Sequence, residues 1–268
     1  MAKTKVLITV KTYPAISSTY EELVCTAGIL ENGEWIRIYP IQFRKLDFAK
    51  QYAKYDWIEI DLVKNDKDFR PESYRPYSYD SVPDVVGHIG TEKQWIHRSD
   101  WILKNVYNDL SVLISEAKTK KTSLAMFKPS KIIGFDVTPC EREWDRAKLE
   151  ALKQGNIFQE RNDKFEVVRK LPYEFRYIFE DCNGKRSKLL IEDWEIGALY
   201  WNCLIDANGN EDIALKKVRD RYFDEFMAKK ELYLFLGTRY VEHAKNYSNP
   251  FSIIGVYYPP KIQQLSLF

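Results

Sequence analysis

Apolar and polar positions alternate in several short stretches of the first half of the chain. The pattern is clearest in "YDWIEIDLV" (55–63) and "GEWIRIYP" (33–40), and "VLITV" (6–10) is a compact apolar run. A period of two residues is typical of strands with one buried face. Short strands joined by tight turns favour a small barrel over a parallel α/β sheet.

Two Asn-Gly pairs lie between such stretches. Asn32-Gly33 joins two apolar runs and predicts a hairpin with a type I′ turn, and Asn183-Gly184 predicts a second hairpin. Residues 66–84 contain three prolines, which predicts a loop and excludes a central strand. The stretch "KIIGFDVTP" (131–139) predicts one more strand.

Helical periodicity follows the loop and dominates the second half. Thr91 and Gln94 have the spacing of a capping box, and an apolar stripe predicts a helix over 99–117. Asp193 precedes the apolar "WEIGALYWNC" segment, and Asn210 precedes a long amphipathic segment that ends near residue 230. Both are suitable N-cap residues.

These elements predict an α+β chain, with an OB-like, β-rich barrel in the first half and a smaller α+β second half. The expected boundaries are 1–140 for the barrel, 141–260 for the second domain and 261–268 for a flexible tail. Pro259-Pro260 would separate that tail from the last strand.

Composition narrows the class of protein. The formal net charge is only +2, so nucleic-acid binding would depend on local patches of charge. The four cysteines are scattered without a CxxC pair, which indicates reduced thiols in a cytoplasmic protein. No stretch approaches the length of a membrane span, and no signal peptide is recognisable, so we expect no membrane partner.

The last five residues carry the sharpest functional signal. The stretch Gln264-Leu265-Ser266-Leu267-Phe268 resembles the short peptide by which bacterial replication and repair proteins bind the β sliding clamp. The resemblance implies that Gln264 would bind a polar pocket and that Leu267 and Phe268 would fill an apolar cleft. The alternative is that the tail packs onto its own domain.

Aromatic and basic residues gather in the first half. Rings that stack on bases and cations that bind phosphates are typical of single-strand binders. The candidate DNA-binding residues are Lys11, Tyr13, Trp35, Arg37, Tyr39, Arg70, Tyr74 and Arg75. The same pattern fits a sheet whose second face is covered by a helix, which would place Trp35 and Tyr39 in the core. The stretch "VCTAGI…GEWIRIYP" also resembles uncharacterised bacterial proteins with paired OB domains.

An enzyme is the competing class. Asp193 and Glu195 could hold a divalent metal in a clamp-tethered nuclease or DNA-modifying enzyme, although an N-cap explains Asp193 more simply. Without that alternative, no cofactor is expected. The sequence thus predicts a nucleoid-associated protein recruited to DNA, in single-stranded form or as a duplex, by the clamp. Repair, replication control and defence against phage are all compatible settings.

Overall fold

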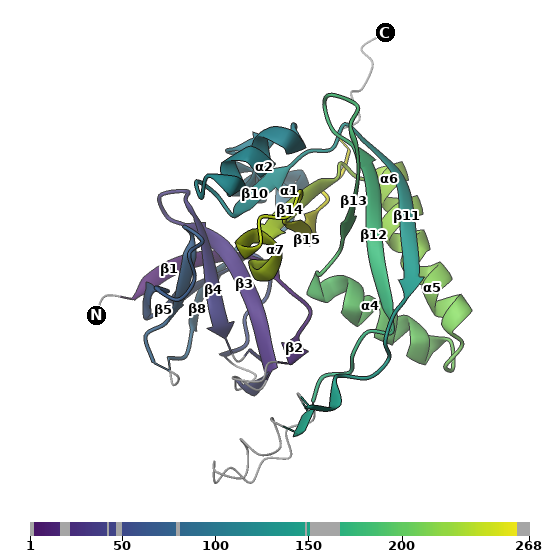
Figure 1. The fold of residues 1–268 in the computed structure, drawn as a ribbon, viewed down its shortest axis with the longest axis horizontal. Coiled ribbons are helices and arrows are strands. Elements are labelled where there is room, and N and C mark those ends of the chain that lie inside the picture. Colours follow the sequence, from purple (N-terminus) through teal and green to yellow (C-terminus); the bar gives the residue numbers. More distant parts are fainter. Residues whose placement is uncertain are drawn as a thin grey trace. The chain divides into compact units, whose positions relative to one another are not determined.

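The computed structural model describes residues 3–16, 22–41, 43–46, 50–78, 81–147, 149–150 and 167–261. The chain forms two compact units. Unit 1 comprises Met1–His88 and Val137–Phe175, and unit 2 comprises Ile89–Asp136 and Arg176–Phe268. The fold is of the α+β class and is rich in strands, as predicted (Figure 1).

A curled sheet forms the body of unit 1 (Figure 1). Its hydrogen-bonded path is β6-β7-β4-β3-β1-β5-β8, and β2 pairs with β3. The strands are β1 (Thr4–Lys11), β2 (Ala15–Ile16), β3 (Glu22–Leu30), β4 (Trp35–Ile41), β5 (Asp56–Ile60), β6 (Leu62–Lys64), β7 (Ser73–Pro76) and β8 (Asp84–His88), with a 3-10 turn η1 (Phe43–Lys45) after β4.

The path of strand pairing returns to its start. β5 pairs with β1, and β6 pairs with β7, while only Asp61 separates β5 from β6. β7 in turn lies parallel to β4, which pairs with β3, and β3 pairs with β1. Alternating residues of these strands, such as Ile36, Ile38 and Ile58, are fully buried and form the core that the period of two predicts.

Unit 2 combines a second sheet, of order β15-β14-β10-β9, with several helices. Its strands are β9 (Val106–Tyr107), β10 (Leu124–Phe127), β14 (Tyr233–Thr238) and β15 (Phe251–Tyr257). Its helices are α1 (Glu92–Ile102), α2 (Leu110–Lys118), α4 (Trp194–Asp206), α5 (Glu211–Arg219), the π-helical η3 (Asp220–Glu225), α6 (Phe226–Lys229) and α7 (Tyr240–Ala244). No described helix is long and apolar enough to be a candidate membrane span.

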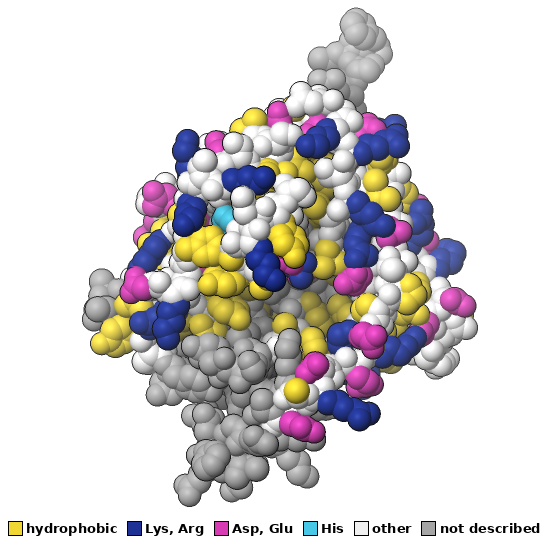
Figure 2. Space-filling view, in the orientation of Figure 1, with side chains coloured by type: hydrophobic (Ala, Val, Ile, Leu, Met, Phe, Trp, Pro, Cys, Tyr) yellow, Lys and Arg dark blue, Asp and Glu magenta, His cyan; other side chains and the backbone are white. Residues whose placement is uncertain are grey.

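A three-stranded sheet has the order β11-β12-β13, with bounds Lys131–Pro139, Tyr173–Glu180 and Arg186–Leu190. One face of this sheet is buried through Phe135, Tyr177 and Phe179. On the other face, Lys188 forms an ion pair with Asp136 at 2.8 Å, and Arg and Lys side chains mingle with acidic ones (Figure 2).

Both Asn-Gly hairpins are present, but the turn type predicted for the first is wrong. Gly33 has a φ of 88°, whereas Asn32 is absent from the described residues with positive φ. The Gly33 N–H donates to the Leu30 carbonyl at 2.8 Å, which closes an ordinary turn before a left-handed glycine. The Gly184 hairpin, with a φ of 72° and a bond to the Asp181 carbonyl, is built the same way.

The predicted helix over 99–117 is also wrong, because the chain forms α1, then β9, then α2. The Asp109 side chain accepts hydrogen bonds from the Ser111 and Val112 N–H groups and starts α2 afresh. Thr91 occupies the N-cap of α1 but makes no side-chain cap bond, so the expected capping box does not form. Residues 93–95 instead have positive φ, which interrupts α1 near its start.

Candidate nucleic-acid interface

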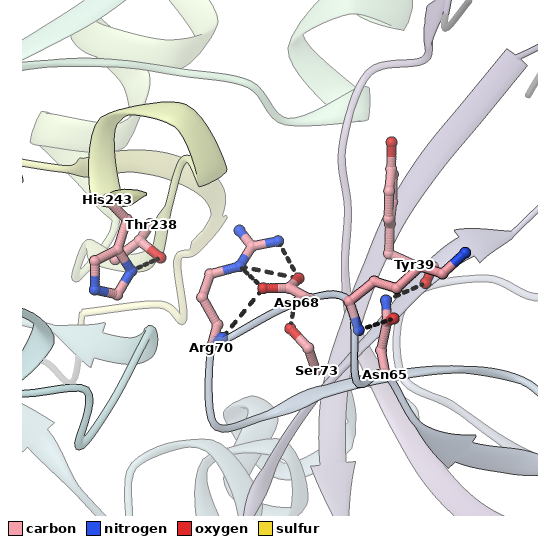
Figure 3. Close-up of polar contacts among 8 residues, drawn as sticks. Tyr39, Asn65, Asp68, Arg70, Ser73, Thr238 and His243 are labelled. Carbon is pink, nitrogen blue, oxygen red and sulfur yellow. Dashed lines mark hydrogen bonds and ion pairs between the residues drawn. The ribbon is translucent and has the colours of Figure 1, made fainter. Parts of the chain in front are cut away.

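The loop between β6 and β7 is organised around a buried ion pair (Figure 3). The Arg70 guanidinium donates to both carboxylate oxygens of Asp68, with Nε–Oδ1 at 2.9 Å and Nη2–Oδ2 at 2.5 Å. Ser73 Oγ donates to the same carboxylate at 2.8 Å. Arg70 and Asp68 are only 7% and 8% exposed, so this pair is part of the interior of unit 1.

The electrostatics of the loop follow from this arrangement. Burial alone would raise the pKa of Asp68, but the hydrogen bonds and positive charge of Arg70, with the bond from Ser73, hold that pKa below its usual value. Asn65 ties the start of the loop, since its side chain accepts from the Lys67 N–H at 3.3 Å and donates to the Tyr39 carbonyl at 3.4 Å (Figure 3). The loop is therefore held by its own polar side chains.

Arg37 lies beneath this loop and is 2% exposed. Its backbone N–H donates to the Glu72 carbonyl at 2.8 Å. Burial, together with the nearby charge of Arg70, lowers the pKa of Arg37 to about 10. The expectation that Arg37 and Arg70 lie open to a phosphate backbone is wrong, because both guanidinium groups are enclosed.

The edge formed by β6 and β7 does present exposed cations and rings. Lys64 and Tyr74 are paired across the two strands, with the ammonium 4.6 Å from the ring centroid. Arg75 is exposed and donates to the carbonyls of Pro76 and Tyr77 at 3.2 and 3.4 Å. Tyr77 is 56% exposed. Within the described part of the chain, neither Lys64 nor Arg75 has a carboxylate partner.

Other predicted DNA-binding residues of unit 1 already form contacts within the protein. The Lys11 ammonium donates to the Tyr52 carbonyl at 2.9 Å and lies 4.1 Å from the Phe43 ring centroid. Tyr13 donates its hydroxyl to the Arg169 carbonyl at 2.8 Å. Trp35 and Tyr39 are half-buried. Of the predicted residues, Arg37 and Arg70 are thus buried, Trp35, Tyr39 and Tyr74 are half-buried, and Arg75 is exposed.

The acidic candidates belong to unit 2. Asp193 is fully buried and caps α4 by accepting from the Glu195 N–H at 3.2 Å, which confirms the simpler interpretation, while Glu195 is half-buried. Among the described residues, no three His, Cys, Asp or Glu side chains are grouped to hold a metal. The peptide 264–268 lies outside the described residues.

Figure 3 also draws His243, a buried residue of unit 2. Its Nε2 lies 2.8 Å from the Ala117 carbonyl and its Nδ1 lies 3.0 Å from the Thr238 hydroxyl. A carbonyl can only accept, so Nε2 carries the proton and Nδ1 accepts from Thr238 in the neutral ring. Both nitrogens are used to join α7, β14 and α2, which indicates a structural histidine.

Sequence reasoning missed β7 and the lysines near it. The three prolines in 66–84 suggested an unbroken loop, yet residues 73–76 form a strand with Pro76 at its end, opposite Leu62. By the period of two, Lys64 falls on the same face as Ile58, Ile60 and Leu62, so the alternation gave no signal that Lys64 is exposed. Lys67, exposed in the loop, follows no pattern that would single it out.

Comparison with known proteins gives family matches. Residues 107–268 match a domain of unknown function, DUF8757, and residues 2–104 match another, DUF8758. No curated protein matches the chain. A solved structure of a murine DNA-binding protein with double-stranded DNA aligns over 97% of this chain and 95% of its own, at 11% identity and a TM-score of 0.32. The DUF8757 match spans more than half of the sequence, so the chain belongs to that family.

Proposed function

We propose that this DUF8757 protein is a DNA-associated protein that binds single-stranded DNA along the β6–β7 edge and is recruited by a bacterial sliding clamp. The observation that carries the DNA-binding part is the edge itself. It presents two cations without a carboxylate partner among the described residues: Lys64 lies over the ring of Tyr74, and Arg75 donates to the carbonyl of the exposed Tyr77. Cations beside exposed rings are the combination by which single-strand binders hold phosphates and bases.

The topology of unit 1 supports an OB-like barrel. When β5 and β6 are counted as one strand bent at Asp61, strands β1, β3, β4, β5–β6 and β7 form a closed path of pairing. OB folds are five-stranded barrels that bind oligonucleotides through the second and third strands and through two loops, one of which joins strands four and five. Residues 65–72 are the equivalent connection here, between β6 and β7.

The buried ion pair gives this loop a defined shape. Asp68 and Arg70 bond each other inside the loop, which leaves exposed Lys67 at a fixed position beside the edge. A preorganised site loses less conformational entropy on binding than a mobile loop does. Arg37 and Arg70 thus contribute to binding through the shape of the loop, and Lys64, Lys67 and Arg75 contribute the contacts.

The experiment is a salt titration of single-stranded DNA binding, followed by fluorescence anisotropy. A Lys64→Ala, Arg75→Ala double variant is compared with a Lys5→Ala, Lys50→Ala variant of equal charge, whose lysines form ion pairs with Glu31 and Asp84. The slope of log K against log salt should fall by about one for each cation that is removed from the contact. The control variant should keep the wild-type slope. Equal slopes in both variants would place the binding elsewhere.

Recruitment by the clamp rests on the resemblance of residues 264–268 to clamp-binding peptides. The described chain leads to this peptide from a fixed point: the Glu231 N–H donates to the Pro259 carbonyl at 2.9 Å, and Lys261 donates to the carbonyls of Lys229 and Met227 at 3.2 and 2.6 Å. These bonds hold the segment before the peptide against unit 2. A short terminal peptide that follows such an anchor can bind a groove on a partner without unfolding the unit.

Calorimetric titration with a bacterial β clamp tests the recruitment. A Leu267→Ala, Phe268→Ala variant should lose binding, because the change removes both apolar anchors from a short interface. An Ile262→Ala, Gln263→Ala variant, changed just before the motif, should bind as the wild type does. The wild-type affinity should be about micromolar, since ordering a peptide opposes binding. If the tail variant instead unfolds, and neither the wild type nor any variant binds the clamp, the tail packs onto its own domain.

A further inference from the structure

Unit 2 contains a lysine-lined pocket that the proposed DNA edge does not use. The pocket has a volume of about 460 Å³ and lies between the β10–β11 connection, the end of α6 and Lys261. Its charged lining residues are Lys128, Lys131, Lys230, Lys261 and Glu231. Four lysines and one glutamate leave a formal net charge of +3, more than the +2 of the entire chain.

The single carboxylate of the pocket is already engaged. Lys128 Nζ lies 2.9 Å from Glu231 Oε1 and 4.0 Å from the ring centroid of Tyr233. Burial, followed by the charge of Glu231, raises the pKa of Tyr233 to about 12, so this ring stays neutral at physiological pH. Lys128 and Glu231 therefore neutralise each other at one side of the pocket.

The other three lysines form no ion pair with a described residue. Lys261 Nζ donates to the Met227 carbonyl at 2.6 Å, which fixes its position without cancelling its charge. The ammonium groups of Lys131 and Lys230 form neither an ion pair nor a hydrogen bond with any other described residue. Three lysines thus line a pocket in which, among its described lining residues, the one carboxylate is already paired with Lys128.

Apart from Ser130, whose hydroxyl donates to the Glu180 and Asp181 carbonyls, the rest of the lining is apolar. Pro129, Ile132, Met227 and Leu232 border the same space, and Leu232 is 5% exposed. Ligand pockets of this size class commonly pair an apolar wall with a few convergent polar groups. Lysine is a common phosphate binder that acts as a point charge. A ligand that fits both parts carries a phosphate at one end and a flat, weakly polar ring at the other.

We propose that this pocket binds the phosphate of a nucleotide, with Lys131, Lys230 and Lys261 around the phosphate and the apolar wall against the base or sugar. The same chemistry is available from a free nucleotide and from the phosphorylated 5′ end of a DNA strand. The proposal does not depend on DNA binding at the β6–β7 edge, because every residue of the pocket belongs to unit 2.

The test is a calorimetric titration of the full chain with adenosine 5′-monophosphate in low-salt buffer free of phosphate. Adenosine should not bind measurably, and inorganic phosphate should bind more weakly than the nucleotide. A Lys131→Gln, Lys230→Gln variant should bind the nucleotide about tenfold to a hundredfold more weakly, the loss expected when charged hydrogen-bond donors are removed. A Lys121→Gln, Lys245→Gln variant changes two exposed lysines of unit 2 and the net charge equally, and should bind like the wild type.

Competition identifies the source of the phosphate. A 5′-phosphorylated oligonucleotide that displaces the nucleotide, while its 5′-hydroxyl counterpart does not, assigns the pocket to strand ends. If neither strand displaces it, the pocket binds free nucleotides. The DNA edge is tested separately, since a 5′-hydroxyl oligonucleotide should bind the pocket variant normally and the Lys64→Ala, Arg75→Ala variant weakly. The proposal is overturned if the nucleotide does not bind, if adenosine binds equally well, or if the pocket and control variants bind it alike.

Discussion

Arg70 in unit 1 and Lys230 in unit 2 each carry one positive charge near a turn in the chain, yet they use it in opposite ways. Arg70 is 7% exposed and forms bonds to both oxygens of Asp68, whereas Lys230 lines an open pocket and has no carboxylate partner among the described residues. Arg37 is enclosed like Arg70, at 2% exposed, and Arg75 is exposed. Enclosed cations shape the molecule, and open cations remain available to a ligand.

The geometry of the side chains explains part of this division. A guanidinium is planar and can bond both oxygens of a carboxylate at once, which suits a buried pair. An ammonium is compact and strongly hydrated, so burying it without a close partner is unfavourable, because the lost hydration outweighs the new contacts. Arg75 shows that the residue type does not decide alone, because this arginine on β7 is exposed.

We expect the largest effect from replacing Arg70, which should lower the stability of the protein. An Arg70→Ala variant leaves the buried Asp68 carboxylate without its main partner, and removing one member of a buried pair typically lowers the free energy of unfolding by about 3–5 kcal/mol. Urea denaturation measures the loss. Arg75→Ala serves as the control and should change stability by less than about 0.5 kcal/mol. An Arg70→Ala protein of normal stability would show that the pair is dispensable.

We expect the next largest effect from removing the exposed ring of Tyr77, which should weaken DNA binding. Tyr77→Ala should weaken single-stranded DNA binding by about 1–3 kcal/mol, the usual loss when one stacking ring is removed. Stability should not change, because the ring is 56% exposed. Tyr247→Ala removes a tyrosine of similar exposure, 50%, from unit 2 and should leave the affinity unchanged. Equal losses in the two variants would indicate a nonspecific effect of lost aromatic surface.

Asp193 extends the comparison to carboxylates, since it is as enclosed as Asp68. Asp193→Ala should lower the free energy of unfolding by about 1 kcal/mol, the typical cost of a lost N-cap. Thermal unfolding monitored by circular dichroism measures it, and Asp193→Asn, which can still cap, should recover most of the loss. The enzyme alternative would gain support from a different result: the wild type cleaves DNA in the presence of a divalent metal, and Asp193→Ala folds normally but does not cleave DNA.

We expect the smallest effect from lowering the pH, which protonates Asp68 and reduces the stability of the protein. The pKa of Asp68 is lower in the folded state than the value of about 3.9 expected for an unfolded chain. The stabilisation from this pair is therefore present above about pH 4 and is lost as the pH falls through the folded pKa. Between pH 5 and pH 2.5, the free energy of unfolding should fall more steeply in the wild type than in Asp68→Asn, because the asparagine side chain takes up no proton. Parallel curves would mean that Arg70 does not lower the pKa.

Local pattern predicted much of the fold. The strands that contain Ile36, Ile38 and Ile58 follow from alternation, and both hairpins follow from Asn-Gly pairs, since a glycine accepts the left-handed backbone of Gly33 and Gly184. The caps Asp193 and Asn210 were also predicted, and their side chains accept the expected N–H bonds. These features depend on residues close together in the sequence.

The wrong predictions depend on residues that are distant in the sequence. Alternation places Arg37 opposite Ile36, but it cannot indicate that residues 68–72 cover that side of β4. The break between α1 and α2 likewise depends on β9, where Val106 pairs with Met126 of β10. Asn105, Asn108 and Asp109 were local hints of a break, because such residues favour turns and caps over helix interiors.

Crosslinking tests the central claim most directly. A single-stranded oligonucleotide that carries bromodeoxyuridine is irradiated in complex with the full chain, and the attached peptides are mapped by mass spectrometry. The account predicts adducts on the β6–β7 edge, at Tyr74 or Tyr77, and their loss in the Lys64→Ala, Arg75→Ala variant. Adducts confined to other parts of the chain, unchanged in that variant, would contradict the assignment of DNA binding to this edge.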